Sequence, residues 1–162
     1  MFVIKKLDRK KIIIVGIIVI VLILITVTLF SMNQKSLTAY CDNIGSYQLE
    51  ITEDFTIEDF FKQFDLEINP SSVQKNSITI PSEFNKVYER YNQLQLSQGL
   101  DLSNYKGENA ERYTYDITNY PSNADVKANV IIFNNKVIAG DLCTVSLNGV
   151  MTTLDDKTIT QE

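Results

Sequence analysis

The longest hydrophobic stretch of the chain lies near its start, where residues 12–30 read IIIVGIIVIVLILITVTLF without a charged residue. A helix of this length extends roughly 28 Å, close to the thickness of the hydrocarbon core of a bilayer. Its many β-branched residues would favour a strand in water, but in lipid a lone strand would leave its backbone groups without hydrogen bonds. The pattern therefore predicts a transmembrane helix over residues 12–30.

Charges on either side of this segment predict its orientation. The residues before it include five bases, namely Lys5, Lys6, Arg9, Lys10 and Lys11, whereas Lys35 is the one base close behind it. By the positive-inside rule, residues 1–11 form a cytoplasmic tail and everything after residue 30 lies outside. The segment is longer than the apolar core of a secretory signal and lacks a small-residue cleavage site, so an uncleaved signal anchor is favoured over a cleaved form.

The rest of the chain is more polar and predicts one extracytoplasmic domain. Residues 31–43 are polar and are typical of a stalk. Residues 44–154 are numerous enough to bury a core of their own. Residues 155–162 are polar again and predict a frayed tail.

Two helices are expected in residues 44–154. The first follows a capping-box pattern at Thr56–Asp59 and carries the apolar residues Ile57, Phe60, Phe61 and Phe64. The second is expected to begin at Pro81, since proline suits a first helical turn, and to end at Gly99. Its apolar stripe has helical spacing and consists of Phe84, Val87, Tyr88, Tyr91 and Leu94.

Alternation of apolar and polar residues predicts antiparallel strands in the last third of the chain, at residues 112–118, 126–133 and 136–145. Asn134 and Asn135 suit a two-residue type I′ turn, because asparagine tolerates positive φ. The register expected for this hairpin places Ile132 by Val137, Val130 by Ala139, and Ala128 by Asp141. The predicted fold class is α+β: an N-terminal transmembrane helix followed by one extracytoplasmic domain, with an antiparallel sheet packed by one or two helices.

The amino-acid composition excludes several kinds of catalytic, metal-binding and nucleic-acid-binding function. The chain has no histidine, which excludes histidine-based acid–base and nucleophilic catalysis and histidine-containing zinc sites, and two cysteines make no disulfide framework. Ten bases and nineteen acids follow residue 30, a net charge of −9 that disfavours nucleic acid as a partner. Acidic residues such as Glu50 and Asp54 form no EF-hand loop. No metal site and no cofactor are predicted.

Asp141 is the most unusual residue, since the strand pattern places this carboxylate on a face shared with Val137, Ala139, Cys143 and Val145. A buried carboxylate needs hydrogen-bonding partners, and Tyr113, Tyr115 and Arg112 are the candidates. The simpler interpretation is a structural hydrogen-bond centre, or an aspartate at a bulge beside Gly140. On this interpretation Asp141→Ala destabilises the domain and removes no activity.

The tyrosines offer a second candidate surface. Tyr88, Tyr91, Tyr113 and Tyr115 fit the core, with their hydroxyls at its rim. Tyr105 and Tyr120 fall in predicted loops and are candidates for stacking against a carbohydrate or a peptide. The candidate binding residues are therefore Asp141, Tyr105, Tyr120 and Arg112, and no catalytic residue is assigned.

An ordered set of short motifs resembles a known family. The set comprises Ile80-Pro81-Ser82-Glu83-Phe84, Tyr91–Gln95, Gly99–Gly107, Arg112-Tyr113-Thr114-Tyr115, Asn119-Tyr120-Pro121, Ala128-Asn129-Val130 and Gly140-Asp141. From about Asp59 to Leu154 the chain resembles the bacterial domain of unknown function 4830. The resemblance implies a Gram-positive, clostridia-like source and a domain commonly carried behind one membrane helix. It implies no catalytic residue.

These observations favour a single-pass membrane protein with a non-catalytic binding or interaction domain at the cell envelope. Its expected partners are the lipid bilayer and an envelope protein or cell-wall ligand. One alternative is an envelope enzyme that uses carboxylates such as Asp141; it predicts a cleft where Asp141 meets a second carboxylate or an open pair of backbone donors. The other is a sensor, which would need a membrane partner because its cytoplasmic tail is too short for an output domain.

Overall fold

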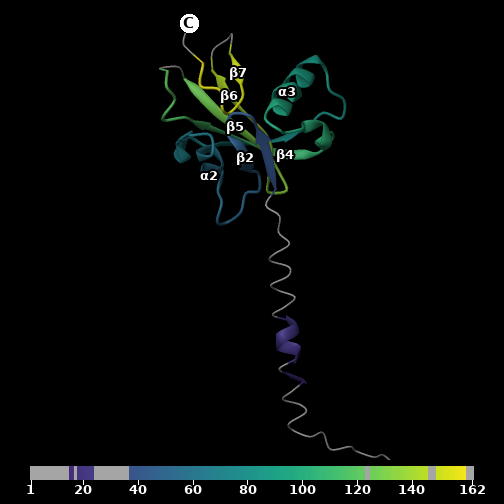
Figure 1. Ribbon diagram of the computed structural model, residues 1–162. Coiled ribbons are helices and arrows are strands. Elements are labelled where there is room, and N and C mark those ends of the chain that lie inside the picture. The colour runs from purple at the N-terminus through teal and green to yellow at the C-terminus, as the bar shows by residue number, and fades with distance from the viewer. Residues whose placement is uncertain (1–14, 17, 24–36, 123–124, 146–148, 160–162) are drawn as a thin grey trace, which may run out of the picture. The chain divides into compact units, whose positions relative to one another are not determined.

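The computed structural model describes residues 15–16, 18–23, 37–122, 125–145 and 149–159 (Figure 1). The chain divides into two units between Lys35 and Ser36. In the first unit, residues 15–16 and 18–23 are helical, while the rest of the predicted span 12–30 and the predicted tail 1–11 lie outside the described residues. Within the described ranges, no helix has the length and apolar character needed to cross a membrane.

The second unit is an α+β domain, as predicted. A short hairpin joins β1 (Thr38–Cys41) to β2 (Gly45–Gln48), and a second, antiparallel sheet has the strand order β3-β4-β5-β6-β7. Its strands are β3 (Gln74–Thr79), β4 (Asn109–Asp116), β5 (Val126–Phe133), β6 (Lys136–Thr144) and β7 (Met151–Thr152). The helices are α2 (Ile57–Lys62) and α3 (Lys86–Ser97), with short 3₁₀ turns at Pro70–Ser72 and Leu102–Tyr105.

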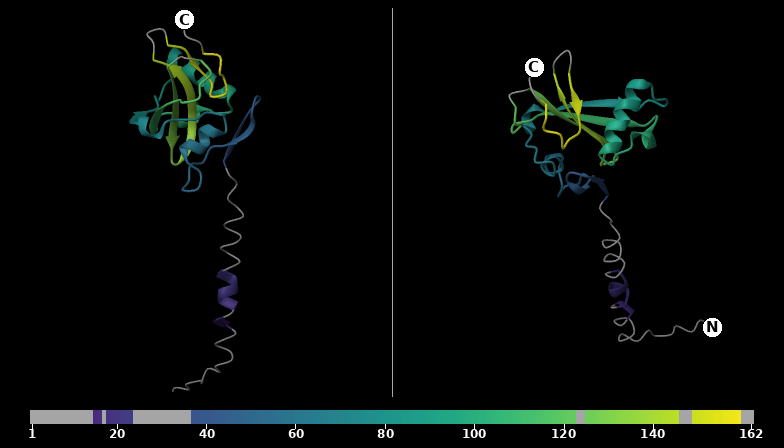
Figure 2. Two further views of the ribbon diagram at one scale, coloured as in Figure 1. Left: turned by 90° about the vertical axis from the view of Figure 1, so that its left-hand side faces the viewer. Right: turned by 45° about the horizontal axis from the view of Figure 1, so that its top comes forward.

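The larger sheet has α2 and the β1–β2 hairpin on one face and α3 on the other (Figure 2), and buried side chains form a core on each face. The larger core lies under α2 and the β1–β2 hairpin, where Phe60, Phe61 and Phe64 are buried. The smaller core lies on the α3 side and includes Ile80, Leu102, Ala110, Ile131, Ile138 and Ala139. Neighbouring strand residues alternate between the two faces, so Val130 belongs to the first core and Ile131 to the second.

The expected boundaries of the domain need two corrections. Thr38–Cys41 is not stalk, because it forms β1 and pairs with β2, and Cys41 is buried. The tail is not frayed from residue 155 either. Ile159 is buried, and its backbone N–H donates to the hydroxyl of Tyr120 at 3.0 Å. Residues 31–36 and 160–162 lie outside the described residues.

Local signals in the sequence set the ends of both helices. The capping box at Thr56 and Asp59 is confirmed and precedes α2. α3 begins at Lys86 and not at Pro81, because the Asn85 side chain accepts hydrogen bonds from the N–H groups of Val87 and Tyr88. The expected end of α3 is confirmed.

The C-terminus of α3 is a Schellman motif. Gly99 has a φ of +76°, its N–H donates to the carbonyl of Leu96, and the N–H of Leu100 donates to the carbonyl of Gln95. A Cβ at Gly99 would lie 2.4 Å from the carbonyl oxygen of Tyr40, so only glycine fits between this turn and β1.

A bulge changes the register of the β5–β6 hairpin. Both Asn134 and Asn135 have positive φ, which confirms the predicted turn, and Ile132 pairs with Val137 as expected. The next pair is Ile131 with Ala139, so Ile138 is an extra residue in β6. Beyond it the expected register is wrong by one residue. Asp141 lies opposite Asn129, not Ala128, and therefore on the α3 face of the sheet.

Candidate functional site

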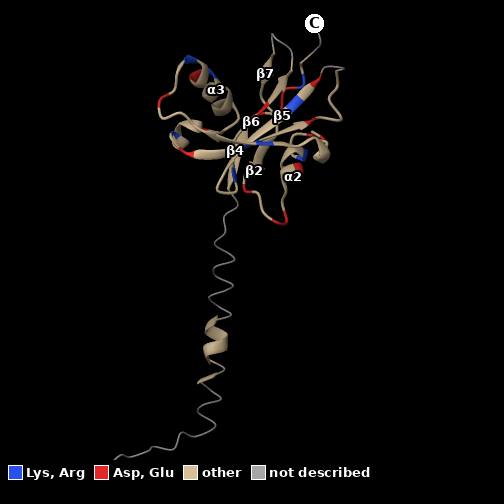
Figure 3. Ribbon diagram, turned by 180° about the vertical axis from the view of Figure 1, so that it is seen from behind, with Lys and Arg blue, Asp and Glu red and all other residues tan. Residues whose placement is uncertain are grey.

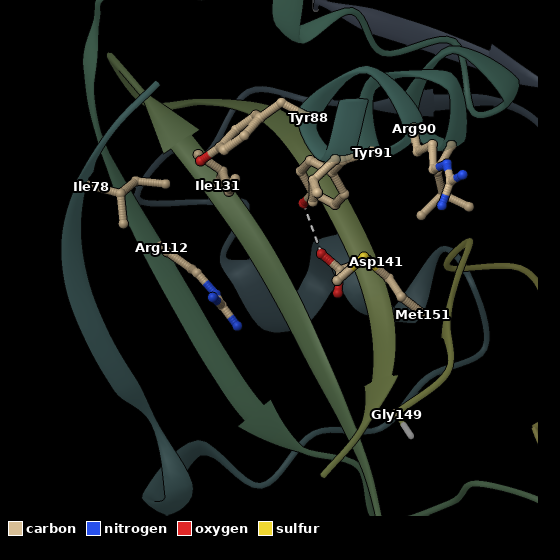
Figure 4. Close-up of a pocket in the computed structure, with 11 residues that line it drawn as sticks. Ile78, Tyr88, Arg90, Tyr91, Arg112, Ile131, Asp141, Gly149 and Met151 are labelled. Carbon is tan, nitrogen blue, oxygen red and sulfur yellow. Dashed lines mark hydrogen bonds between the residues drawn. The ribbon is translucent and has the colours of Figure 1, made fainter. Parts of the chain in front are cut away.

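A groove of about 640 Å³ lies between α3 and the sheet (Figure 4). Its lining residues come from α3 (Val87, Tyr88, Arg90, Tyr91, Leu94), from the sheet (Ile78, Arg112, Ile131, Asp141) and from the segment at β7 (Gly149, Met151). This size lies within the usual range of small-molecule sites, as does a mainly apolar lining with a few polar groups. The groove is therefore the candidate site of this domain.

Four of the five residues of the predicted apolar stripe form a wall of this groove, while Phe84 precedes α3 and packs against the smaller core. Tyr88, Tyr91 and Leu94 are half-buried and Val87 is exposed. The buried side chains of α3 are instead the amides of Asn92 and Gln95. Tyr91 packs against the smaller core, as predicted, and also lines the groove. Val87, Tyr88 and Leu94 line the groove without belonging to that core, so this part of the stripe is accessible to a ligand.

Polar side chains attach α3 to the sheet beside the groove. The Oε1 of Gln95 accepts a hydrogen bond from the N–H of Gly140 at 2.9 Å, and the Nε2 of Gln98 donates to the Gly140 carbonyl at 2.9 Å. The Oε1 of Gln98 also accepts from the N–H of Leu154 at 2.8 Å. The two amides thus pair with the N–H and the C=O of Gly140 on the edge of β6 that faces away from β5. They do so two residues before Leu142, where β7 begins to pair with β6. These hydrogen bonds hold α3 at a fixed distance from the sheet.

Asp141 lies at the floor of the groove, with only 3% of its surface exposed. Tyr91 projects from α3 toward it, and its hydroxyl donates to Oδ1 at 2.8 Å (Figure 4). The Nδ2 of Asn129 donates to Oδ2 at 2.7 Å. Burial raises the pKa of Asp141, although these hydrogen bonds and the charge of Arg112 oppose the shift.

The expected partners of Asp141 are corrected by this geometry. Tyr113 and Tyr115 pack with the core on the opposite face of the sheet, so the bulge removes them from reach. Arg112 lines the same groove, but it is linked to Asp141 indirectly, because both hydrogen-bond to the side chain of Asn129.

Burial and the neighbouring Asp141 raise the pKa of Tyr91, which keeps its hydroxyl protonated as a donor.

Asn129 links the buried carboxylate to Arg112. It is buried, and its Oδ1 accepts from the Thr114 hydroxyl at 2.6 Å and from the Arg112 guanidinium, with Nη2 at 3.0 Å and Nε at 3.3 Å. Because Asp141 takes the donor end of the amide, the acceptor end is turned to Arg112. Asp141 and Asn129 therefore orient Arg112 in the groove.

The structure brings together two of the four predicted binding residues, Asp141 and Arg112. Tyr105 does not line the groove; its ring packs edge-on against Phe133, with the centroids 5.6 Å apart. Tyr120 does not line it either, since its hydroxyl is engaged with the C-terminal segment at Asp156 and Ile159.

Sequence reasoning missed Tyr91, Asn129 and Arg90 as members of the site. One signal was present for Asn129, a lone amide in the apolar strand VKANVIIF, facing an equally isolated aspartate in the next strand. No comparable signal marked Arg90, because its place beside the groove depends on how α3 packs on the sheet.

This arrangement is suited to binding. Both oxygens of Asp141 are already hydrogen-bonded, and it is the one acidic residue among the described residues that line the groove. Paired-carboxylate chemistry needs a second carboxylate at a defined separation, which the lining does not supply. Nor do the described residues contain a cluster of acidic or cysteine side chains suited to a metal ion.

Comparison with known proteins places most of this domain in one family. No curated protein and no solved structure matched the chain. The sequence pattern of the family described as a domain of unknown function, DUF4830, matches residues 54–142. The match runs from just before α2 into β6 and includes every groove residue named above except Gly149 and Met151. The resemblance noted in the sequence is thus confirmed, and the chain belongs to the DUF4830 family.

Proposed function

We propose that this chain is a single-pass membrane protein whose extracytoplasmic domain is a non-catalytic binding module at the cell envelope. The observation that carries the binding role is the groove between α3 and the sheet, where apolar walls surround a few oriented polar groups. The membrane role is supported by the uncharged segment 12–30 and the bases that precede it.

The enzyme alternative has less support. It requires Asp141 to meet a substrate, yet this carboxylate is 3% exposed and holds hydrogen bonds from Tyr91 and Asn129. A general acid or base must come within hydrogen-bonding reach of the proton it transfers. Asp141 serves better as a support for the groove than as a group that reacts in it.

Cysteine labelling in intact cells tests the topology. We expect Ser82→Cys, at an exposed position, to react with a membrane-impermeant maleimide, and Lys5→Cys to react only after the cells are permeabilised. The unmodified chain, with its native Cys41 and Cys143, gives the background. If Ser82→Cys is protected until permeabilisation, the domain does not lie outside the membrane.

A ligand screen tests the binding role. Full-length protein in lipid nanodiscs is heated with compounds drawn from cell-envelope extracts, and we expect some to raise its melting temperature, since a ligand that binds only the folded state stabilises it. Ile78→Trp places a larger ring in the groove from β3 and should abolish those shifts.

Ser77→Trp is the matched control, because this neighbouring exposed residue of β3 points to the opposite face of the sheet. It should keep every shift seen with the unmodified protein. Shifts that survive in Ile78→Trp would place the binding site elsewhere.

A further inference from the structure

The basic residues among the described groove lining are two arginines, Arg90 and Arg112. Acidic and basic residues are spread over its helices, strands and loops (Figure 3). Among the seven described lysines of the domain, Lys62, Lys75, Lys127 and Lys157 each form an ion pair with a carboxylate, whereas Lys86, Lys106 and Lys136 form none. Arg90 and Arg112 form none, although acids outnumber bases in this part of the chain. Both line the groove.

Arg112 is held in a fixed orientation with one edge left open. Its Nε and Nη2 are directed at the Oδ1 of Asn129, and no described residue accepts a hydrogen bond from Nη1. The edge formed by Nη1 and Nη2 carries two parallel N–H groups, the geometry that pairs with both oxygens of a carboxylate. The buried amide and Asp141 behind it supply the support that a preformed anion site requires.

The remaining lining indicates what the anionic group is attached to. Ile78, Ile131, Val87 and Leu94 offer apolar surface, which excludes a compact inorganic anion as the best fit. The hydroxyl of Tyr88 and the guanidinium of Arg90 also border the groove, and neither hydrogen-bonds to a described residue. A hydrocarbon chain would bury these polar groups without partners, at a cost, whereas the carbonyl groups of a peptide would accept their hydrogen bonds.

We propose that the groove binds the carboxyl terminus of a peptide whose last residue is apolar, with the terminal carboxylate paired to the open edge of Arg112. This rests on the proposed binding function and gives it a ligand class. Capture of a free C-terminal carboxylate by oriented N–H donors is an established mode of peptide recognition. The last side chain would lie against Ile78 and Ile131, and the preceding backbone would run toward Tyr88 and Arg90.

The test uses full-length protein immobilised in nanodiscs. It is exposed to a pool of short N-acetylated peptides randomised at their last positions, prepared once with free carboxyl ends and once with carboxamide ends, and retained peptides are identified by mass spectrometry. We expect free acids with an apolar last residue to be retained about tenfold better than the amides, because a charge-assisted pair contributes at least the 1.4 kcal/mol that tenfold requires.

Variants assign that preference to Arg112. Arg112→Gln should reduce retention of the acids to the level of the amides, and Arg112→Lys should restore part of it, since lysine keeps the charge without the fork. Lys106→Gln, an exposed charge outside the groove, should change nothing. A thermal melt of each variant confirms that it is folded.

Two results of this experiment would overturn the proposal: equal retention of acids and amides, or an acid preference that survives in Arg112→Gln. A third would come from a separate measurement, in which the protein is kept lipid-free in an amphipathic polymer. If the protein then binds decanoate but retains no peptide, the proposal is also overturned. In the last case, loss of decanoate binding in Ile78→Trp would leave the groove as the binding site. Loss of the peptide ligand is thereby separated from loss of the binding function itself.

Discussion

Replacing Gln98 by alanine should lower the free energy of unfolding by about 3–5 kcal/mol, the loss expected when a buried side chain leaves both a cavity and unpaired polar groups. Gln98 is 1% exposed, and its amide joins the carbonyl of Gly140 to the N–H of Leu154. Truncation would leave both backbone groups without partners inside the protein. Urea unfolding of the full-length protein, followed by circular dichroism, measures the change.

Two further variants separate the hydrogen bonds from the cavity. Gln98→Met fills most of the volume without the amide and should recover only part of the lost stability. Gln93→Ala removes an exposed amide from the same helix and should stay within about 0.5 kcal/mol of the unmodified protein. A loss below 1 kcal/mol in Gln98→Ala would mean that this amide does not hold α3 to β6.

Features that depend on a few neighbouring residues could be predicted from the sequence. The capping box at Thr56, the positive-φ turn at Asn134 and Asn135, and the end of α3 at Gly99 all follow from local hydrogen bonding or local sterics. The antiparallel sheet could be predicted too, because apolar and polar residues alternate along a strand that has one buried face.

Features that depend on packing between distant segments could not. The extra residue Ile138 in β6 moves Asp141 to the other face of the sheet, and a pattern with a strict period of two cannot detect a single insertion. The sequence of α3 favours burial of its whole aromatic stripe, but only Phe84 and Tyr91 pack against the smaller core. The fully buried side chains are those of Gln95 and Gln98, because the edge of β6 offers N–H and C=O groups that amides can pair.

The groove follows from those same two features. Asp141 reaches it through the bulge, and the aromatic side of α3 borders it because the amide side is attached to the sheet. Asp141 and Arg112 were both predicted from the sequence, the second as a candidate partner of the first, and both line the groove. The orientation of Arg112 by Asn129 required the true register.

Replacing Asp141 by alanine should lower the free energy of unfolding by about 2–3 kcal/mol at acidic pH, because the Asn129 amide and the Tyr91 hydroxyl lose a shared acceptor. The pKa of Asp141 is raised by burial, so the folded chain holds this proton more firmly than the unfolded chain does. The stability of the unmodified protein therefore falls as the pH rises from the ordinary aspartate pKa to the raised value. The alanine variant lacks this contribution, and its deficit should shrink over the same window.

Asp141→Asn isolates the charge from the hydrogen bonds. The asparagine carbonyl accepts from Asn129, and its NH₂ donates to the Tyr91 oxygen, so the network persists without a buried charge. We expect this variant to gain stability relative to the unmodified protein as the pH rises through that window, and then to hold a constant advantage. Urea midpoints measured from pH 3 upward give both trends. If the stability of the unmodified protein instead rises with pH relative to Asp141→Asn, the pKa of Asp141 is lowered in the fold, and hydrogen bonding outweighs burial at the floor of the groove.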